Sequence, residues 1–257
     1  METFKDYAYY YNLFYGDKDY RKEAEQVDCM IKHYTKKEVK TILNMGCGTG
    51  KHDFELCDLG YKMTGIDLSD EMIEIAKENS KKSKCKPNFQ VADVRTYETE
   101  MKFDTVISLF HVMSYQNENE DIVQAIETAG KALELGGLFI FDVWYGPGVL
   151  TERPEIRIKQ VEDEKNTLIR YAKPVMHAEK NLVDVNYDVI IIDKKTAVAR
   201  KICETHHMRY FFAPEIRYIL EKAGFSLLDC LDCNTMKKTD YNSWTAFFIA
   251  IKNREIN

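Results

Sequence analysis

The sequence has little basic charge and no long apolar run. Its formal net charge is −6 at pH 7, and its pI is about 5.6. Because a nucleic-acid backbone is normally bound by a basic face, we expect no nucleic-acid partner. No apolar stretch approaches the length of a membrane span, and the N-terminus METFKDYAYYY lacks the basic region and apolar core of a signal peptide. We therefore expect a cytoplasmic protein with no membrane partner.

Cysteine occurs without the pairing typical of a zinc site. Cys230 and Cys233 form a C-x-x-C pair, but they lie in the strand-like run FSLLDCLDC, which would point the two sulfur atoms to opposite faces. The second pair that a four-sulfur zinc site needs is absent. The other cysteines are Cys29, Cys47, Cys57, Cys85 and Cys203. Since the chain shows no export signal, we expect free thiols and neither a metal site nor a redox site.

Internal repeats, low-complexity tracts and an interdomain linker are also absent from the sequence. With 257 residues, of which 45% are apolar and 30% charged, the chain is long enough to bury one sizeable core and a subdomain. Extensive disorder is not expected.

Glycines interrupt an apolar run in residues 42–50, ILNMGCGTG. Gly46, Gly48 and Gly50 are typical of a buried strand that turns tightly into a helix and lets a ligand approach the bare backbone. A second short apolar run ends in Asp67, about twenty positions later, where a carboxylate at a strand end can accept both hydroxyls of a ribose. Together they predict a nucleoside ligand.

The glycine spacing disfavours a dinucleotide. The fingerprint G-x-G-x-x-G is not met, since the third glycine comes one residue early and Lys51 holds the expected position. Residues 42–50 instead resemble the first motif of class I S-adenosylmethionine-dependent methyltransferases, and residues 64–69 resemble their second motif. This resemblance implies S-adenosylmethionine as the cofactor. One departure is Asn44, at the position where the family commonly carries an acid that helps to orient the methionyl ammonium.

Further site residues follow from the same resemblance. It implies that Asp93, after the third strand, meets the adenine amino group, that the Val94 N–H meets the ring, and that Leu68 and Met72 flank adenine. Residues 101–109, MKFDTVISL, resemble the fourth family motif and lead into Phe110 and His111. Because ligands of open α/β sheets bind at the carboxyl ends of the strands, we expect these two residues to face the transferred methyl group.

The N-terminal stretch is rich in tyrosine, and residues 11–20, YNLFYGDKDY, resemble the N-terminal segment of small-molecule methyltransferases that include sugar N-methyltransferases. The resemblance implies that Tyr15 lies near the transferred methyl group and Tyr20 near the methionyl end of the cofactor. We expect the tyrosines of the first twenty residues to close a lid or a shallow groove: Tyr7, Tyr9, Tyr10, Tyr11, Tyr15 and Tyr20. The alternative is that these rings simply pack an N-terminal helix.

The periodicity changes between residues 146 and 212, where strand-like runs alternate with polar turns. We expect an antiparallel insertion that covers the pocket or, by family analogy, makes a homodimer contact. Arg170, Arg209 and three histidines lie in it, either as substrate contacts or as solvated side chains. We predict a helical lid (1–35), a cofactor-binding core (36–145 and 213–257) and the insertion (146–212). The fold class is α/β: a doubly wound, mostly parallel seven-stranded sheet with an inserted antiparallel cap.

The resemblance implies methyl transfer to an amine or hydroxyl of a small molecule, with an amino sugar favoured by the N-terminal segment. Alignment of donor and acceptor can supply about 7–11 kcal/mol, whereas a positioned base is worth about 10² to 10⁴ in rate. A protein without an obvious base is therefore still a candidate enzyme. The alternatives are a non-catalytic protein that binds S-adenosylmethionine, and a nicotinamide-dependent oxidoreductase. DNA amine methylation is disfavoured, because residues 109–112 lack the expected Pro-Pro-aromatic signature.

Overall fold

The computed structural model describes residues 13–16 and 18–255, which form two compact units. Residues 19–152 and 210–255 make up one of them, which we call the α/β unit. Residues 13–16, 18 and 153–209 make up the other, which we call the antiparallel unit. Tyr7, Tyr9, Tyr10 and Tyr11 lie outside the described residues.

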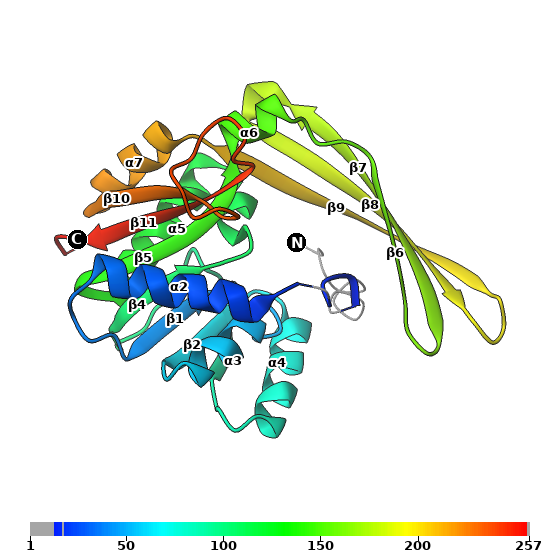
Figure 1. Ribbon diagram of the computed structural model, residues 1–257, viewed down its shortest axis with the longest axis horizontal. Coiled ribbons are helices and arrows are strands. Elements are labelled where there is room, and N and C mark those ends of the chain that lie inside the picture. Colours follow the sequence, from blue (N-terminus) through cyan, green and yellow to red (C-terminus); the bar gives the residue numbers. More distant parts are fainter. Residues whose placement is uncertain (1–12, 17, 256–257) are drawn as a thin grey trace. The chain divides into compact units, whose positions relative to one another are not determined.

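The α/β unit contains a seven-stranded sheet in the order β3-β2-β1-β4-β5-β11-β10 (Figure 1). Its parallel strands are β1 (Thr41–Met45), β2 (Lys62–Asp67), β3 (Asn88–Val91), β4 (Phe103–Ser108), β5 (Leu133–Tyr145) and β10 (Phe225–Asp232). The antiparallel strand β11 (Thr245–Lys252) lies between β5 and β10. The predicted doubly wound, mostly parallel seven-stranded sheet is confirmed.

Helices cover both faces of this sheet because successive strand residues point to opposite sides. On one face, Ile42 and Ile140 pack with α2 (Tyr20–Tyr34) and α3 (Lys51–Asp58). On the other face, Leu43 and Phe141 pack with α5 (Asn119–Ala132) and α7 (Ala213–Lys222). The remaining helices of the unit are α4 (Asp70–Lys82), α6 (Gly146–Thr151) and the short 3-10 helix η1 (Val112–Tyr115).

Several expected boundaries differ from those observed. The expected single lid over residues 1–35 is divided, since α2 packs on α3 in the α/β unit while residues 13–16 belong to the antiparallel unit. Helix α5 stops at Ala132, because the chain already enters β5 at Leu133. The expected insertion begins later than residue 146, because α6 packs with the α/β unit.

The antiparallel unit is a four-stranded meander with its own small core. Its strands β6 (Arg157–Glu162), β7 (Asn166–His177), β8 (Leu182–Asp193) and β9 (Ala199–Phe211) pair in that order, and η2 (Ala178–Lys180) forms the turn between β7 and β8. Phe14 is fully buried against Leu168, Val189 and Ile191. The last two residues of β9 reach the α/β unit, where they pair in parallel with Trp144 and Tyr145 of β5.

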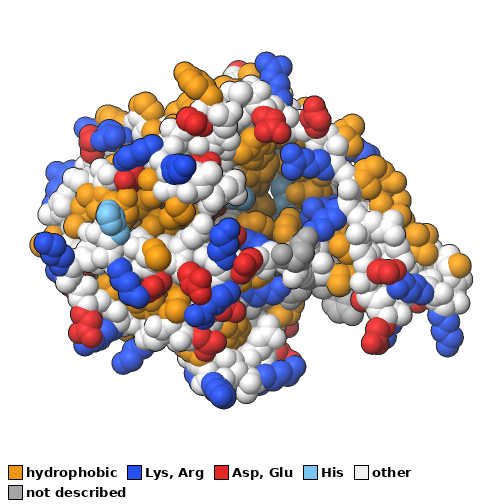
Figure 2. All heavy atoms as spheres, viewed as in Figure 1, with side chains coloured by type: hydrophobic (Ala, Val, Ile, Leu, Met, Phe, Trp, Pro, Cys, Tyr) orange, Lys and Arg blue, Asp and Glu red, His pale blue; other side chains and the backbone are white. Residues whose placement is uncertain are grey.

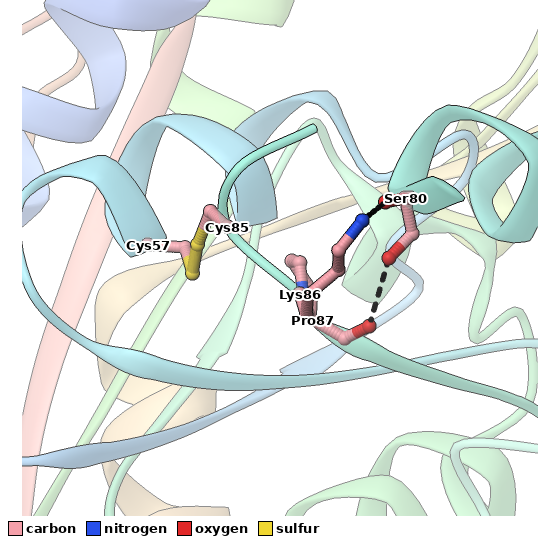
Figure 3. The surroundings of a disulfide bond; sticks show 5 residues. All are labelled: Cys57, Ser80, Cys85, Lys86 and Pro87. Atoms are coloured by element: carbon pink, nitrogen blue, oxygen red, sulfur yellow. Dashed lines mark hydrogen bonds between the residues drawn. A yellow bond between two sulfur atoms is a disulfide. The ribbon is translucent and has the colours of Figure 1, made fainter. Parts of the chain in front are cut away.

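A disulfide corrects the expectation of seven free thiols. Cys57, in α3, is bonded to Cys85, in the loop between α4 and β3, with their Cα atoms 6.0 Å apart (Figure 3). The same loop is held by Lys86, whose Nζ donates to the backbone oxygen of Ser80 over 2.6 Å. Helix packing brings these segments together from 28 residues apart, which the spacing of cysteines alone cannot indicate. The other five cysteines are free thiols.

The surface of the α/β unit is mixed in charge. On the face shown in Figure 2, Lys and Arg side chains are interspersed with Asp and Glu side chains. Such a surface differs from the basic face that a nucleic-acid backbone attracts. Over the described part of the chain, no helix combines the length and the apolar character that crossing a membrane requires.

Candidate active site

The glycine turn follows β1, and all three of its glycines adopt positive φ: 82° at Gly46, 54° at Gly48 and 78° at Gly50. A Cβ atom on Gly46 would lie 2.5 Å from Val112, and one on Gly50 would lie 2.5 Å from the ring of Phe89. A Cβ on Gly48 would meet no described atom within 4 Å. The packing of the chain itself therefore requires Gly46 and Gly50, whereas Gly48 faces open space.

Asp67 ends β2 and is bonded to the glycine turn. Its Oδ2 accepts from the Gly48 N–H at 2.8 Å, and its Oδ1 accepts from the Ser69 N–H at 2.9 Å. Burial raises the pKa of the Asp67 carboxyl, and these backbone donors partly offset that effect. Each carboxylate oxygen can accept a further hydrogen bond, so the group can still serve a ligand hydroxyl.

A buried amide and a buried acid lie beneath the turn, and their pairing was not predicted from the sequence. Asn44 Nδ2 donates to Asp53 Oδ2 at 2.7 Å, and both side chains are buried. Burial raises the pKa of Asp53 to about 7. An acid at position 44, common in the family, would here face a second carboxyl. Asn44, which replaces the acid common at this position in the family, therefore pairs with the carboxyl of Asp53 in the first turn of α3.

Asp93 lies at the neighbouring strand end, where the backbone N–H of Ala92 donates to the Asp67 oxygen at 2.9 Å. Both Asp93 carboxylate oxygens accept from Arg95, with the shortest contact, from Nη2, at 2.6 Å. Arg95 also donates to Asp121 at 2.7 Å. The pairing with Arg95 lowers the pKa of Asp93, although burial acts against it. Asp93 was expected at this site from the sequence, whereas its pairing with Arg95 was not predicted.

The other residues expected around adenine differ in exposure. Leu68 is 52% exposed, whereas Met72 is only 3% exposed and Val94 is buried. Met72 lies in the first turn of α4, where its backbone N–H donates to Oγ of the N-cap residue Ser69 at 3.2 Å. Leu68 is thus the side chain of this group that offers a free apolar surface to a ligand.

The loop after β4 has an unusual backbone. Phe110 and His111 both have φ of 66°, a region that costs energy for residues other than glycine and is especially rare for a bulky side chain. The backbone N–H of His111 donates to both oxygens of buried Asp142, at 3.1 Å each, and its ring Nδ1 forms an ion-pair contact with Asp142 Oδ2. Asp142 lies on β5, so this side chain ties the loop to the next strand.

The two expected tyrosines belong to different units. Tyr20, at the start of α2, packs edge-on against the ring of His52 at 4.9 Å, and Lys51 Nζ lies 4.8 Å from its ring centroid. Tyr15 belongs to the antiparallel unit, where Arg170 Nη1 donates to its hydroxyl at 3.2 Å. Within the α/β unit, the structure gathers the glycine turn, Asp67, Asp93 and His111 at the carboxyl ends of adjacent strands. Ligands of open α/β sheets generally bind at this edge.

Comparison with known proteins agrees with this arrangement. A family model described as a methyltransferase domain matches residues 42–137, which run from β1 into β5. Over 221 residues the chain is 24% identical to dTDP-3-amino-3,4,6-trideoxy-alpha-D-glucopyranose N,N-dimethyltransferase of Streptomyces venezuelae, covering 85% of this chain and 90% of that protein.

Solved structures share the fold over nearly the whole chain. An S-adenosylmethionine-dependent methyltransferase from Clostridium acetobutylicum ATCC 824 superposes with a TM-score of 0.79 at 21% identity, covering 97% of this chain and 98% of that one. The sugar N-methyltransferase of Streptoalloteichus sp. ATCC 53650 gives a TM-score of 0.79 at 22% identity, covering 95% and 93%. Neither the oxidoreductase nor the non-catalytic alternative gains support from these comparisons. Residues 42–137 therefore match a methyltransferase domain, and the chain shares its fold with S-adenosylmethionine-dependent methyltransferases of known structure.

Proposed function

We propose that this methyltransferase acts on the amine of a small molecule, and specifically on an amino sugar. The observation that carries the proposal is the strand-end arrangement in the α/β unit. Gly48 faces open space, Asp67 is bonded to its N–H, and the loop of His111 packs on Gly46. The name of the Streptomyces venezuelae relative, a dimethyltransferase of an amino sugar nucleotide, favours this acceptor class over a hydroxyl compound.

The residues fit a nucleoside sulfonium. Gly48 leaves room beside the backbone, and Asp67 keeps accessible acceptor capacity for two ribose hydroxyls. When bound, S-adenosylmethionine supplies a methyl group on a sulfonium, whose transfer is intrinsically favourable. We assign the cofactor to the following residues: Tyr20, Gly46, Gly48 and Gly50 for the methionyl part, Asp67 for the ribose, Leu68, Met72, Asp93 and Val94 for adenine, and Phe110 beside the methyl group.

The role of the protein is then mainly alignment. Fixing the acceptor nitrogen on the axis of the transferred group can supply most of the catalytic effect, and a proton acceptor adds about 10² to 10⁴ in rate. His111 is the proposed acceptor-side residue of the α/β unit, and Tyr15 that of the antiparallel unit. Arg170, whose guanidinium carbon lies 4.8 Å from the Phe14 ring and 5.4 Å from the Tyr15 ring, holds the Tyr15 hydroxyl in place.

Isothermal titration with S-adenosylmethionine and with its demethylated product tests the cofactor assignment. We expect micromolar binding by the natural protein and at least about a tenfold loss in Asp67→Ala, because charge-assisted hydrogen bonds to the ribose are removed. Asp70→Ala, an exposed acid three positions along the chain, is the matched control and should bind normally. Unchanged affinity in Asp67→Ala would remove Asp67 from the site, and no binding by the natural protein would overturn the function.

The acceptor is tested separately. Nucleotide-linked amino sugars, other small amines and matched hydroxyl compounds are incubated with the cofactor, and methylated product is followed by mass spectrometry. Turnover with amines alone supports the proposal, whereas turnover with hydroxyl compounds alone contradicts the acceptor class. His111→Ala and Tyr15→Phe should lose turnover while they still bind the cofactor. The cytoplasmic location and the homodimer remain predictions, the second of which is checked by light scattering.

A further inference from the structure

The disulfide between Cys57 and Cys85 joins two segments of the α/β unit that both pack against the glycine turn. Cys57 lies in the last turn of α3, and Cys85 lies three residues before β3 (Figure 3). The Cα atoms are 6.0 Å apart, a distance that a disulfide spans without movement of the backbone. Both residues are half-buried rather than enclosed in the core, so a small thiol reagent can reach the bond.

Each of the joined segments contacts Gly50, the last glycine of the turn. Phe54 in α3 and Phe89 in β3 have ring centroids 5.8 Å apart. A Cβ atom on Gly50 would lie 2.5 Å from the ring of Phe89 and 3.3 Å from that of Phe54. The first turn of α3 also starts from this glycine, since the Phe54 N–H donates to the Gly50 oxygen at 3.0 Å. A movement of α3 relative to β3 would therefore alter the packing around Gly50.

The same bond restrains the strand ends that carry the two acids. The chain between the cysteines, which are 28 positions apart, contains β2 and α4, so Asp67 lies inside the closed loop. Strand β3 follows Cys85 and pairs in parallel with β2, where Val91 lies opposite Asp67. Asp93 comes two positions after Val91. When the disulfide is broken, strand pairing and side-chain packing alone hold these groups in register.

The two thiols have different surroundings when the bond is reduced. Cys85 lies between Lys84 and Lys86, in the segment 81–86 that contains four lysines. Positive charge favours the thiolate, which is the form that attacks a disulfide. Cys57 lies at the C-terminal end of α3, where the helix dipole disfavours a negative charge. We therefore assign the first attack to Cys85.

We propose that Cys57 and Cys85, which join α3 to the segment before β3, form a reversible thiol–disulfide switch that strengthens cofactor binding when oxidised. The inference rests on the proposed function, because it takes the glycine turn, Asp67 and Asp93 as the cofactor site. Binding that orders a site costs conformational entropy, and a site already restrained by a cross-link pays less of it. The oxidised protein therefore binds the cofactor more tightly than the reduced protein.

The oxidant is a low-molecular-weight disulfide such as oxidised glutathione. The Cys85 thiolate attacks one of its sulfur atoms, the sulfur–sulfur bond of the reagent breaks, and one small thiolate leaves. The Cys57 thiolate then attacks the Cys85 sulfur in this mixed disulfide and releases the second small thiolate. Two protein thiols are thus oxidised, one small disulfide is reduced, and the two cysteine protons end on the two released thiols.

Equilibration of the natural protein in glutathione buffers tests the switch without any cofactor. The reaction is quenched with acid, free thiols are alkylated, and peptide mass spectrometry reads the state of Cys57 and Cys85. We expect the bond to break and to form again reversibly as the ratio of reduced to oxidised glutathione is varied. A bond that persists in reduced glutathione alone, or one that never forms in oxidised glutathione, would overturn the inference.

Isothermal titration of both redox states provides the second readout. We expect the dissociation constant for S-adenosylmethionine to be at least about fivefold lower in the oxidised protein, the lower end of the usual coupling between two sites. Saturating cofactor should raise the equilibrium constant for disulfide formation by the same factor, because such coupling is reciprocal. The double variant Cys57→Ser/Cys85→Ser should bind like the reduced protein in either buffer. Cys29→Ser, which removes an exposed free thiol of α2, is the matched control and should keep the full difference.

The two proposals fail in different ways. If neither redox state of the natural protein binds the cofactor, the proposed function is overturned and the switch falls with it. If the cofactor binds and amines are methylated, but the oxidised and reduced proteins bind it equally well, only the switch is overturned. This comparison uses the natural protein in both states, so it decides the matter even where a serine variant does not fold.

Discussion

Two carboxyl groups of the α/β unit, Asp53 in the first turn of α3 and Asp93 after β3, have contrasting environments. Asp53 is fully buried with one amide donor, and its pKa is raised to about 7. Asp93 is paired with Arg95, and its pKa is lowered. Near neutral pH Asp93 is therefore ionised, while a large fraction of Asp53 stays protonated. Residue types alone do not distinguish these groups, because solvent exclusion and the nearest donor set their charge.

At the residue scale, we predict that Asp53→Asn removes a pH dependence of stability. The folded state holds the Asp53 proton more tightly than the unfolded chain, so the free energy of unfolding falls as the pH rises from about 4 to 7 and is flat above. Across this window, the free energy of unfolding of the variant should rise by up to about 4 kcal/mol relative to that of the natural protein. Urea unfolding at pH 5 and pH 8 checks it. A difference in unfolding free energy between variant and natural protein that does not change with pH would contradict the prediction. Asp104→Asn is the control: the pKa of the Asp104 carboxyl is lowered, so the effect of this variant on the free energy of unfolding should be the same at both pH values.

At the element scale, the turn between β1 and α3 and the loop after β4 fix each other. The side chain of Val112, the first residue of η1, occupies the space that a Cβ on Gly46 would need, at 2.5 Å. The residue that precedes Val112 is His111, the proposed acceptor-side residue. The glycine turn and the loop that carries His111 are therefore held against each other by this contact, so the residues proposed for the cofactor and for the acceptor are positioned together.

We predict that Gly46→Ala costs about 2–5 kcal/mol of unfolding free energy, because it combines backbone strain with overpacking. Val112→Ala should relieve the overpacking part, so the double variant should be more stable than the sum of the single changes by about 0.5–3 kcal/mol. Gly48→Ala is the control: it has positive φ but no described neighbour within 4 Å, so only strain of about 1–2 kcal/mol is expected. Urea unfolding of the four variants checks this, and strict additivity at Gly46 and Val112 would refute the contact.

At the scale of the whole molecule, each unit has a core of its own. The α/β unit is built on two large apolar layers, whereas the antiparallel unit relies on a small cluster around Phe14. Phe14 also anchors the segment that carries Tyr15, and Lys159 Nζ donates to the Phe14 oxygen at 2.7 Å. Separate cores of this kind allow separate cooperative units of unfolding.

We predict that Phe14→Ala weakens the antiparallel unit alone, by about 3–5 kcal/mol. Amide hydrogen exchange should quicken in β7 and β8 and stay unchanged in β1 and β4. Phe103→Ala, which opens a cavity in the core of the α/β unit, is the matched control and should give the reverse pattern. Equal acceleration of both units in either variant would show that the molecule unfolds as one cooperative unit.

Much of the fold follows from local patterns that a short window of sequence carries. Positive φ at Gly46 and Gly50, the acid at the end of β2, and the strand runs of β6 to β9 all lie close to where the residues alone predict them. The reason is physical: backbone freedom and apolar periodicity act within a few residues and do not depend on which elements become neighbours.

Tertiary structure alone decided the pairings. Cys57 with Cys85, Asn44 with Asp53, Arg95 with Asp121 and His111 with Asp142 join elements whose contact depends on how helices and strands pack. By itself, the sequence determined the class of fold, the cofactor turn and the strand end where His111 stands. Packing determined which side chain faces each of these groups, and with it their charge and their strain, because these properties arise from solvent exclusion and from partners brought together by the fold.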